Sequence, residues 1–216
     1  MPEDWIPRPP DDLAERVEVE TWEVGRTLER VHNIAYAPNA YRPDPPLEIL
    51  GRFHFFEDPA GRVVPALYGG QALNVALMET VFRSIGREPE ARVIFRSSLL
   101  GLGWSTLAPS RPLRLARLYG TGLRGFGNTA RSLTDTPPTD YHRTVKWAQA
   151  IYAVRDDIDG LVWMSRQLNH ERAAMVFRDR LPTRGLEVRQ MPVSLAVGPG
   201  FRKVRRFASA FGVTVL

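Results

Sequence analysis

The residue types best suited to chemistry in this sequence are a single carboxylate and several arginines placed in apolar surroundings. Glu79 is the one charged residue between Arg62 and Arg83, inside an apolar stretch with helical spacing. A carboxylate in such surroundings costs several kcal/mol unless it is paired or protonated, so we expect a partner to hold it there. A carboxylate fixed in this way can stabilise positive charge that develops during a reaction.

A second set of polar residues lies on apolar segments or directly after one. Tyr68 comes eleven residues before Glu79, and a serine and an arginine follow the apolar run GLVWM at 160–164. The set consists of Arg30, Arg52, Tyr68, Ser165 and Arg166. Taken by type alone, these residues also fit ordinary structural roles, in which Arg30 or Arg52 pairs with Glu79, the tyrosine packs in the core and the serine caps a turn.

Several common kinds of site lack support in the sequence. The four histidines show no metal-ligand spacing, so we expect no metal, and no G-x-S-x-G motif is present for a serine hydrolase. The absence of cysteine excludes thiolate chemistry and disulfides. The segment GTGLRG at 120–125 matches G-x-G-x-x-G, but no helix is predicted after it and it comes too late to open a βαβ unit.

The pattern of apolar residues predicts a mixture of strands and helices in one α+β domain. We expect strands at 27–33, 53–56, 63–68, 91–99, 113–118, 160–164 and 186–188. We expect helices at 72–82, 139–154, 171–180 and 201–211, and mostly loop with one short helix at 119–138. Residues 1–12 are rich in proline and acid, which is typical of an extended arm or a flexible end.

The order of the polar residues along the chain resembles that of the RES-domain proteins, a family named for its Arg, Glu and Ser. The resemblance spans roughly residues 27–180. It is carried by Arg30 in LERVHN, the step Gly51-Arg52-Phe53, the run from Tyr68-Gly-Gly to Leu-Met-Glu79, and Asp-Gly-Leu-Val-Trp-Met followed by Ser165-Arg166. The resemblance divides the chain into an N-terminal extension (1–26), a RES domain (27–181) and a C-terminal extension that packs on the same domain (182–216).

The resemblance implies a fold similar to that of ADP-ribosyltransferases, with a mixed β-sheet core and flanking helices, and an activity that consumes NAD⁺. Members of this family are toxins of RES–Xre toxin–antitoxin pairs that break the nicotinamide–ribose bond by hydrolysis or phosphorolysis. The implied catalytic residues are Arg30, Arg52, Tyr68, Glu79 and Ser165, with Arg166 as a contact to the pyrophosphate. The implied partner is an Xre-like antitoxin that covers the active site.

The two arginines earlier in the chain are expected to act differently. Arg30 lies inside a predicted strand, so we expect it to be buried beside Glu79, where it would keep the carboxylate ionised. Arg52 follows a glycine at the start of a segment, so we expect it to reach outward to the pyrophosphate of the substrate.

Two other functions stay open at this point. The same residues would serve an ADP-ribosyltransferase that modifies a protein. A basic nucleic-acid-binding module is suggested by the net charge of +5 and by the basic segment from Arg202 to Arg206. That segment has no interleaved aromatics, so we expect contact with nucleic acid only indirectly, through the antitoxin. An arginine-rich surface also fits simple solvation.

Composition points to a cytoplasmic protein. The N-terminus has neither the basic region nor the apolar region of a secretory signal, and no run approaches the ~18 apolar residues of a membrane span. The lack of cysteine fits a reducing compartment. We therefore expect no association with a membrane.

Overall fold

The computed structural model describes residues 6–42, 51–83, 85, 92–166, 168 and 170–216. A large sheet of eight strands runs in the order β1-β6-β7-β8-β3-β2-β5-β9, and a small sheet pairs β10 with β4. The strands are β1 (Val19–Trp22), β2 (Leu28–Asn33), β3 (Ala66–Gly70), β4 (Val93–Ile94), β5 (Leu102–Pro109), β6 (Leu113–Arg117), β7 (Gly160–Met164), β8 (Arg172–Phe177), β9 (Leu186–Ser194) and β10 (Thr214–Val215). In the large sheet β6 and β7 are parallel, and the other neighbouring pairs are antiparallel.

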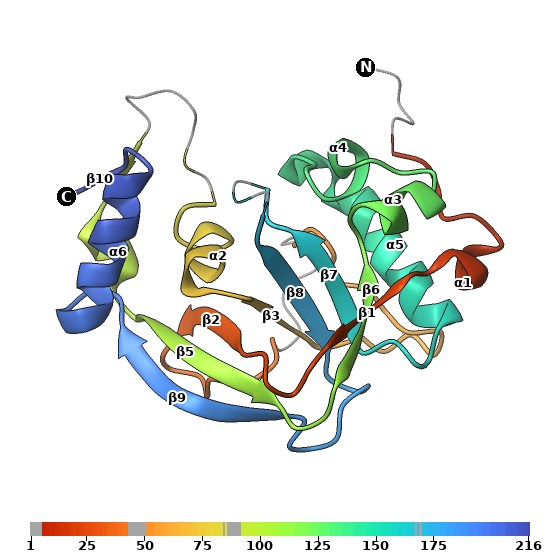
Figure 1. Cartoon of the computed structure of the whole chain (residues 1–216), viewed down its shortest axis with the longest axis horizontal. Coiled ribbons are helices and arrows are strands. Elements are labelled where there is room, and N and C mark those ends of the chain that lie inside the picture. The colour runs from red at the N-terminus through yellow and green to blue at the C-terminus, as the bar shows by residue number, and fades with distance from the viewer. Residues whose placement is uncertain (1–5, 43–50, 84, 86–91, 167, 169) are drawn as a thin grey trace.

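Helices flank this sheet at both ends, as Figure 1 shows. Helices α1, α3, α4 and α5 lie beside β1 and β6, whereas α6 lies with the small sheet at the other end. The α-helices are α1 (Leu13–Arg16), α2 (Leu73–Met78), α3 (Thr121–Gly125), α4 (Ala130–Leu133), α5 (Tyr141–Val154) and α6 (Gly198–Ala210), and two 3₁₀ turns cover Arg96–Leu99 and Pro138–Asp140. The expected α+β fold with a mixed sheet and flanking helices is therefore confirmed.

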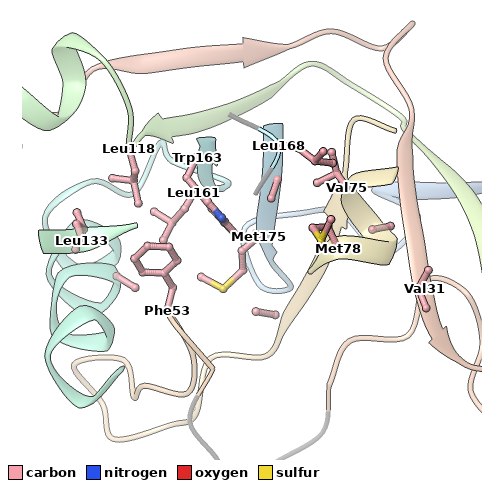
Figure 2. Close-up of a cluster of buried hydrophobic side chains, with 14 of the residues drawn as sticks. Val31, Phe53, Val75, Met78, Leu118, Leu133, Leu161, Trp163, Leu168 and Met175 are labelled. Carbon is pink, nitrogen blue, oxygen red and sulfur yellow. The ribbon is translucent and has the colours of Figure 1, made fainter. Parts of the chain in front are cut away.

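Two apolar clusters hold the sheet and the helices together. One contains Trp22 of β1, Leu107 of β5 and Leu186 of β9, so strands from both ends of the sheet contribute to it and the sheet must curl around it. The other packs the opposite face of the sheet against the helices, and Figure 2 shows part of it, with Trp163 beside Phe53. Full burial of each large apolar side chain is worth about 1.5–3 kcal/mol relative to exposure.

The connection from β3 to α2 depends on two glycines. The sequence pattern predicts that Gly69 and Gly70 end the extended run, but both belong to β3. A Cβ on Gly70 would lie 2.6 Å from the Cβ of Val75, so only glycine lets α2 pack this closely on the strand. Helix α2 is shorter than the predicted 72–82, and its C-cap residue is Glu79.

Three predicted elements are wrong. No strand forms at 53–56, since residues 51–54 make a turn closed by an isolated bridge from Gly51 to His54; residues 93–99 form the two-residue strand β4 and a 3₁₀ turn. The predicted helix at 171–180 is instead the central strand β8. Five of its six residues are buried, because both faces of β8 are covered, so the alternation that marks a half-exposed strand is missing. The prediction also missed β5.

The segments at the two ends of the described chain pack on the same core. Trp147 of α5 donates a hydrogen bond of 2.8 Å to the carbonyl of Pro7, and Ile6 is buried, so residues 6–12 are not a free arm. At the other end, Val204 and Phe207 of α6 are buried in the apolar cluster between the sheet and the helices, the same cluster to which Ile6 belongs. Among the described residues, no helix combines the length and apolar character needed to cross a membrane.

Candidate active site

A hydrogen bond between Ser165 and Glu79 lies at the centre of the candidate site. The hydroxyl of Ser165 donates to Oε1 of Glu79 over 2.8 Å. Ser165 follows β7 directly and is fully buried; its amide donates to the carbonyl of Glu171 over 2.9 Å, next to the last β7–β8 pair, Met164 with Arg172. Glu79 ends α2 and is half-buried. Within the described ranges no ion pair involves Glu79, so the expected arginine partner is not seen there.

Tyr68 and Trp163 form an aromatic wall on the same face of the sheet. Their ring centroids are 6.0 Å apart and the rings meet edge to face. Trp163 is two residues before Ser165, so both side chains point to one side of β7. The Tyr68 hydroxyl is buried, and burial raises its pKa, while the nearby backbone of Phe53 and the charges of Arg42, Arg83 and Arg52 oppose this rise. Tyr68 is therefore protonated at neutral pH and can donate a hydrogen bond.

Arg52 lies in the turn that passes next to the Tyr68 hydroxyl. A Cβ on Gly51 would be 3.4 Å from that hydroxyl oxygen, an ordinary van der Waals contact, so this turn packs directly against Tyr68. The carbonyl of Arg52 accepts a hydrogen bond from Thr144 of α5, and its guanidinium lies 5.7 Å from the centroid of the Tyr141 ring. The turn that carries Arg52 thus lies beside Tyr68, and the Arg52 guanidinium is close enough to oppose the rise that burial causes in the pKa of the Tyr68 hydroxyl.

Arg30 lies on the other face of the sheet. Glu29 is paired with Gly70, so it shares a face with Gly70 and Tyr68, and the next residue, Arg30, points the opposite way. Arg30 is buried, as expected, but its Nη1 donates to the carbonyls of Pro38 and Ala40 over 2.5 and 2.7 Å. Burial lowers its pKa to about 10, so it stays charged at neutral pH. The expectation that Arg30 lies beside Glu79 is therefore wrong.

Arg166 and the basic segment of the C-terminal helix lie on the surface. Arg166 is exposed and forms an ion pair with Asp135, in the loop that follows α4. The basic residues of α6 are also exposed, and they are Arg202, Lys203, Arg205 and Arg206. The structure does not bring any of these side chains to Ser165, although Arg166 is its neighbour in sequence.

The glycine-rich segment 120–125 has a packing role. It forms the one-turn helix α3, and a Cβ on Gly122 would lie 2.1 Å from the carbonyl oxygen of Arg117. Gly120 has a φ of 57°, which favours glycine. Both glycines are therefore explained by the backbone path after β6.

Sequence reasoning missed three residues near the site. Trp163 is in the apolar run 160–164, where its type gave no hint of a role beyond the core. Arg83 comes four residues after Glu79, and in a continuous helix the two side chains would lie on one face, but α2 ends before Arg83. Tyr141 opens α5 and is brought to the site by tertiary packing alone.

Comparisons with known proteins define first the fold and then the family. The fold matches that of a chain in the crystal structure of the MbcT–MbcA toxin–antitoxin complex from M. tuberculosis, with a TM-score of 0.62 and 14% sequence identity. The match covers 91% of this chain and 98% of that chain. At this identity the likeness concerns the fold alone. The RES domain family matches residues 26–197, and the chain therefore belongs to the RES domain family. No curated protein sequence matches it.

Proposed function

We propose that this chain is the toxin of a toxin–antitoxin pair and that it cleaves NAD⁺ at the nicotinamide–ribose bond. The observation that supports this most directly is the Ser165–Glu79 hydrogen bond, on the face of the sheet that carries Tyr68, in a chain of the RES domain family. The similar fold occurs in a structure described as a toxin–antitoxin complex, which supports an antitoxin partner for this chain as well.

The proposed chemistry requires a fixed negative charge. When the bond from ribose C1′ to nicotinamide breaks, its electron pair leaves with nicotinamide, and positive charge develops on the ribose. The Glu79 carboxylate stabilises that charge. Ser165 donates to Oε1 and so leaves Oε2 free to face the sugar. Orientation by a buried hydroxyl means that the carboxylate does not reorganise when the charge appears.

The aromatic wall and Arg52 serve binding in this proposal. Tyr68 is half-buried and packs edge to face on the buried Trp163, so its ring is held in place where the nicotinamide ring can pack against it. The Arg52 guanidinium is suited to bidentate contact with a phosphate of the substrate. The acceptor that attacks C1′ is water, phosphate or a protein side chain, and each gives a different product.

Product analysis tests the proposal. Purified chain is incubated with NAD⁺ in buffer with and without phosphate, and nicotinamide and the second product are measured by chromatography and mass. Hydrolysis gives ADP-ribose, and phosphorolysis gives ADP-ribose carrying a new phosphate on the sugar. Transfer leaves ADP-ribose attached to a protein. We expect release of nicotinamide without attachment of ADP-ribose to a protein. Unchanged NAD⁺ in all conditions would contradict the proposal.

The toxin role has a separate test in cells. Expression of the chain is expected to stop growth and lower cellular NAD⁺, and co-expression of an Xre-like partner is expected to restore both. Growth arrest with normal NAD⁺ would separate toxicity from the proposed chemistry. The partner is expected to cover the face that carries Glu79.

A further inference from the structure

Two guanidinium groups from distant segments meet at one aromatic ring. Cζ of Arg52 lies 5.7 Å from the centroid of the Tyr141 ring, and Cζ of Arg83 lies 5.2 Å from it. Nη2 of Arg83 also donates a hydrogen bond of 2.8 Å to the Tyr141 hydroxyl. Arg52 comes from the turn before β3, Arg83 follows α2, and Tyr141 opens α5. Three elements thus converge on this cluster.

The cluster carries positive charge that no acid offsets within the described ranges. The ion pairs there include neither Arg52 nor Arg83. Nη1 of Arg52 is buried and has no hydrogen-bond partner among the described residues. A buried donor without a partner costs about 1–3 kcal/mol, and two like charges at one ring repel each other. An anion bound between the two guanidinium groups would remove both costs.

The cluster also lies next to the candidate site. Gly51, which precedes Arg52, passes the Tyr68 hydroxyl closely enough that a Cβ there would be 3.4 Å from the oxygen. Tyr68 packs on Trp163, which is two residues before Ser165 on the same face of β7. An anionic group held at the cluster would therefore belong to a molecule that extends along this face to Glu79.

We infer that Arg83, positioned by the Tyr141 hydroxyl, forms with Arg52 a two-arginine site for the diphosphate of the substrate. Two planar guanidinium groups match two linked phosphates, each of which accepts paired hydrogen bonds. The inference rests on the proposed function for the identity of the substrate, and it adds a selectivity: the site takes molecules that carry a diphosphate, and analogues without one bind poorly. Tyr141 acts as a positioning residue, since its hydroxyl orients Arg83.

Binding of inorganic pyrophosphate tests the site without any need for turnover. Calorimetric titrations are made with the wild type and with Arg83→Gln, Tyr141→Phe and Lys146→Gln. Lys146 is an exposed cation on the same helix as Tyr141, so Lys146→Gln is matched in charge. We expect Arg83→Gln to weaken binding about tenfold or more, Tyr141→Phe about threefold, and Lys146→Gln less than twofold. Arg83 is exposed, and melting curves confirm that each variant is folded.

A second arm follows NAD⁺ cleavage by the same variants. Arg83→Gln is expected to raise KM for NAD⁺ about tenfold with little change in kcat, because the contact is shared by the ground and transition states. If pyrophosphate binding depends on Arg83 but NAD⁺ is not cleaved, the proposed function fails and the anion site stands. If NAD⁺ is cleaved but Arg83→Gln behaves like Lys146→Gln in both arms, the inference is overturned and the proposed function stands.

Discussion

The hydroxyl of Ser165 and the carboxylate of Glu79 are joined by a hydrogen bond of 2.8 Å, although 86 positions separate them in the chain. The bond connects the end of β7 with the end of α2 and fixes one oxygen of a half-buried carboxylate. In the proposed reaction it determines which oxygen of Glu79 faces the ribose.

Removing this hydroxyl is expected to slow the reaction without unfolding the protein. A hydrogen bond to a charged group is worth about 1.5–3 kcal/mol, so Ser165→Ala should lower kcat for NAD⁺ cleavage by a factor of about 10–100. Steady-state kinetics with a melting curve checks this, and Ser209→Ala, an exposed serine on α6, is the control. Wild-type kcat in Ser165→Ala would show that the hydroxyl does not orient the carboxylate.

Conservative changes at the two arginines should separate structure from binding. Arg30→Lys loses the fork that holds the carbonyls of Pro38 and Ala40, so the protein should lose about 1–3 kcal/mol of stability while folded molecules keep their kcat. Arg52→Lys should raise KM about tenfold with little change in melting temperature. Thermal melts and steady-state kinetics on both variants test whether Arg30 has a structural role and Arg52 a binding role. A loss of kcat in Arg30→Lys with normal stability would contradict the structural role of Arg30.

A buried histidine should make stability depend on pH. Burial lowers the pKa of His54 to about 4 from the ordinary 6.5, while its bond to the carbonyl of Val64 opposes this slightly. As the pH falls below 6.5, the unfolded state takes up a proton at His54 before the folded state does. The free energy of unfolding therefore has its full value above pH 6.5 and decreases as the pH falls toward 4. This histidine alone should lower the free energy of unfolding by about 2 kcal/mol between pH 7 and pH 5.

Denaturant unfolding at several pH values measures this contribution. His54→Gln should flatten the loss of stability between pH 7 and pH 5, whereas His142→Gln, at an exposed position, should leave the slope unchanged. If the free energy of unfolding depended on pH equally in the wild type and in His54→Gln, protonation of His54 would carry no free-energy cost in the folded state.

The sequence allows the α+β class and several elements to be predicted, since α5, α6, β2 and β6 carry a periodic pattern and β7 is a short, continuous apolar run. It does not reveal β8, because burial on both faces removes the alternation that marks a strand. It also misplaces Arg30. The residue was expected on the face that carries Glu79, but the pairing of Glu29 with Gly70 turns it to the other side. A register of this kind is set by tertiary pairing, which local patterns do not contain.

The candidate site was predictable only in part for the same reason. Glu79 is marked by its isolation among apolar residues, and the family resemblance links it to Ser165. The cluster of Arg83 and Tyr141 depends on the approach of α5 to the segment after α2, and no spacing in the sequence signals that approach.

The most direct test of the account is NAD⁺ cleavage by Glu79→Gln. The amide keeps the shape of the side chain and can still accept the Ser165 hydrogen bond, but it removes the negative charge that the ribose requires. Glu57→Gln, at an exposed position, is the matched control. We expect Glu79→Gln to retain its melting temperature and its affinity for pyrophosphate while kcat falls by a factor of about 100 or more. A folded Glu79→Gln protein that releases nicotinamide at the rate of Glu57→Gln would contradict the central role of this carboxylate.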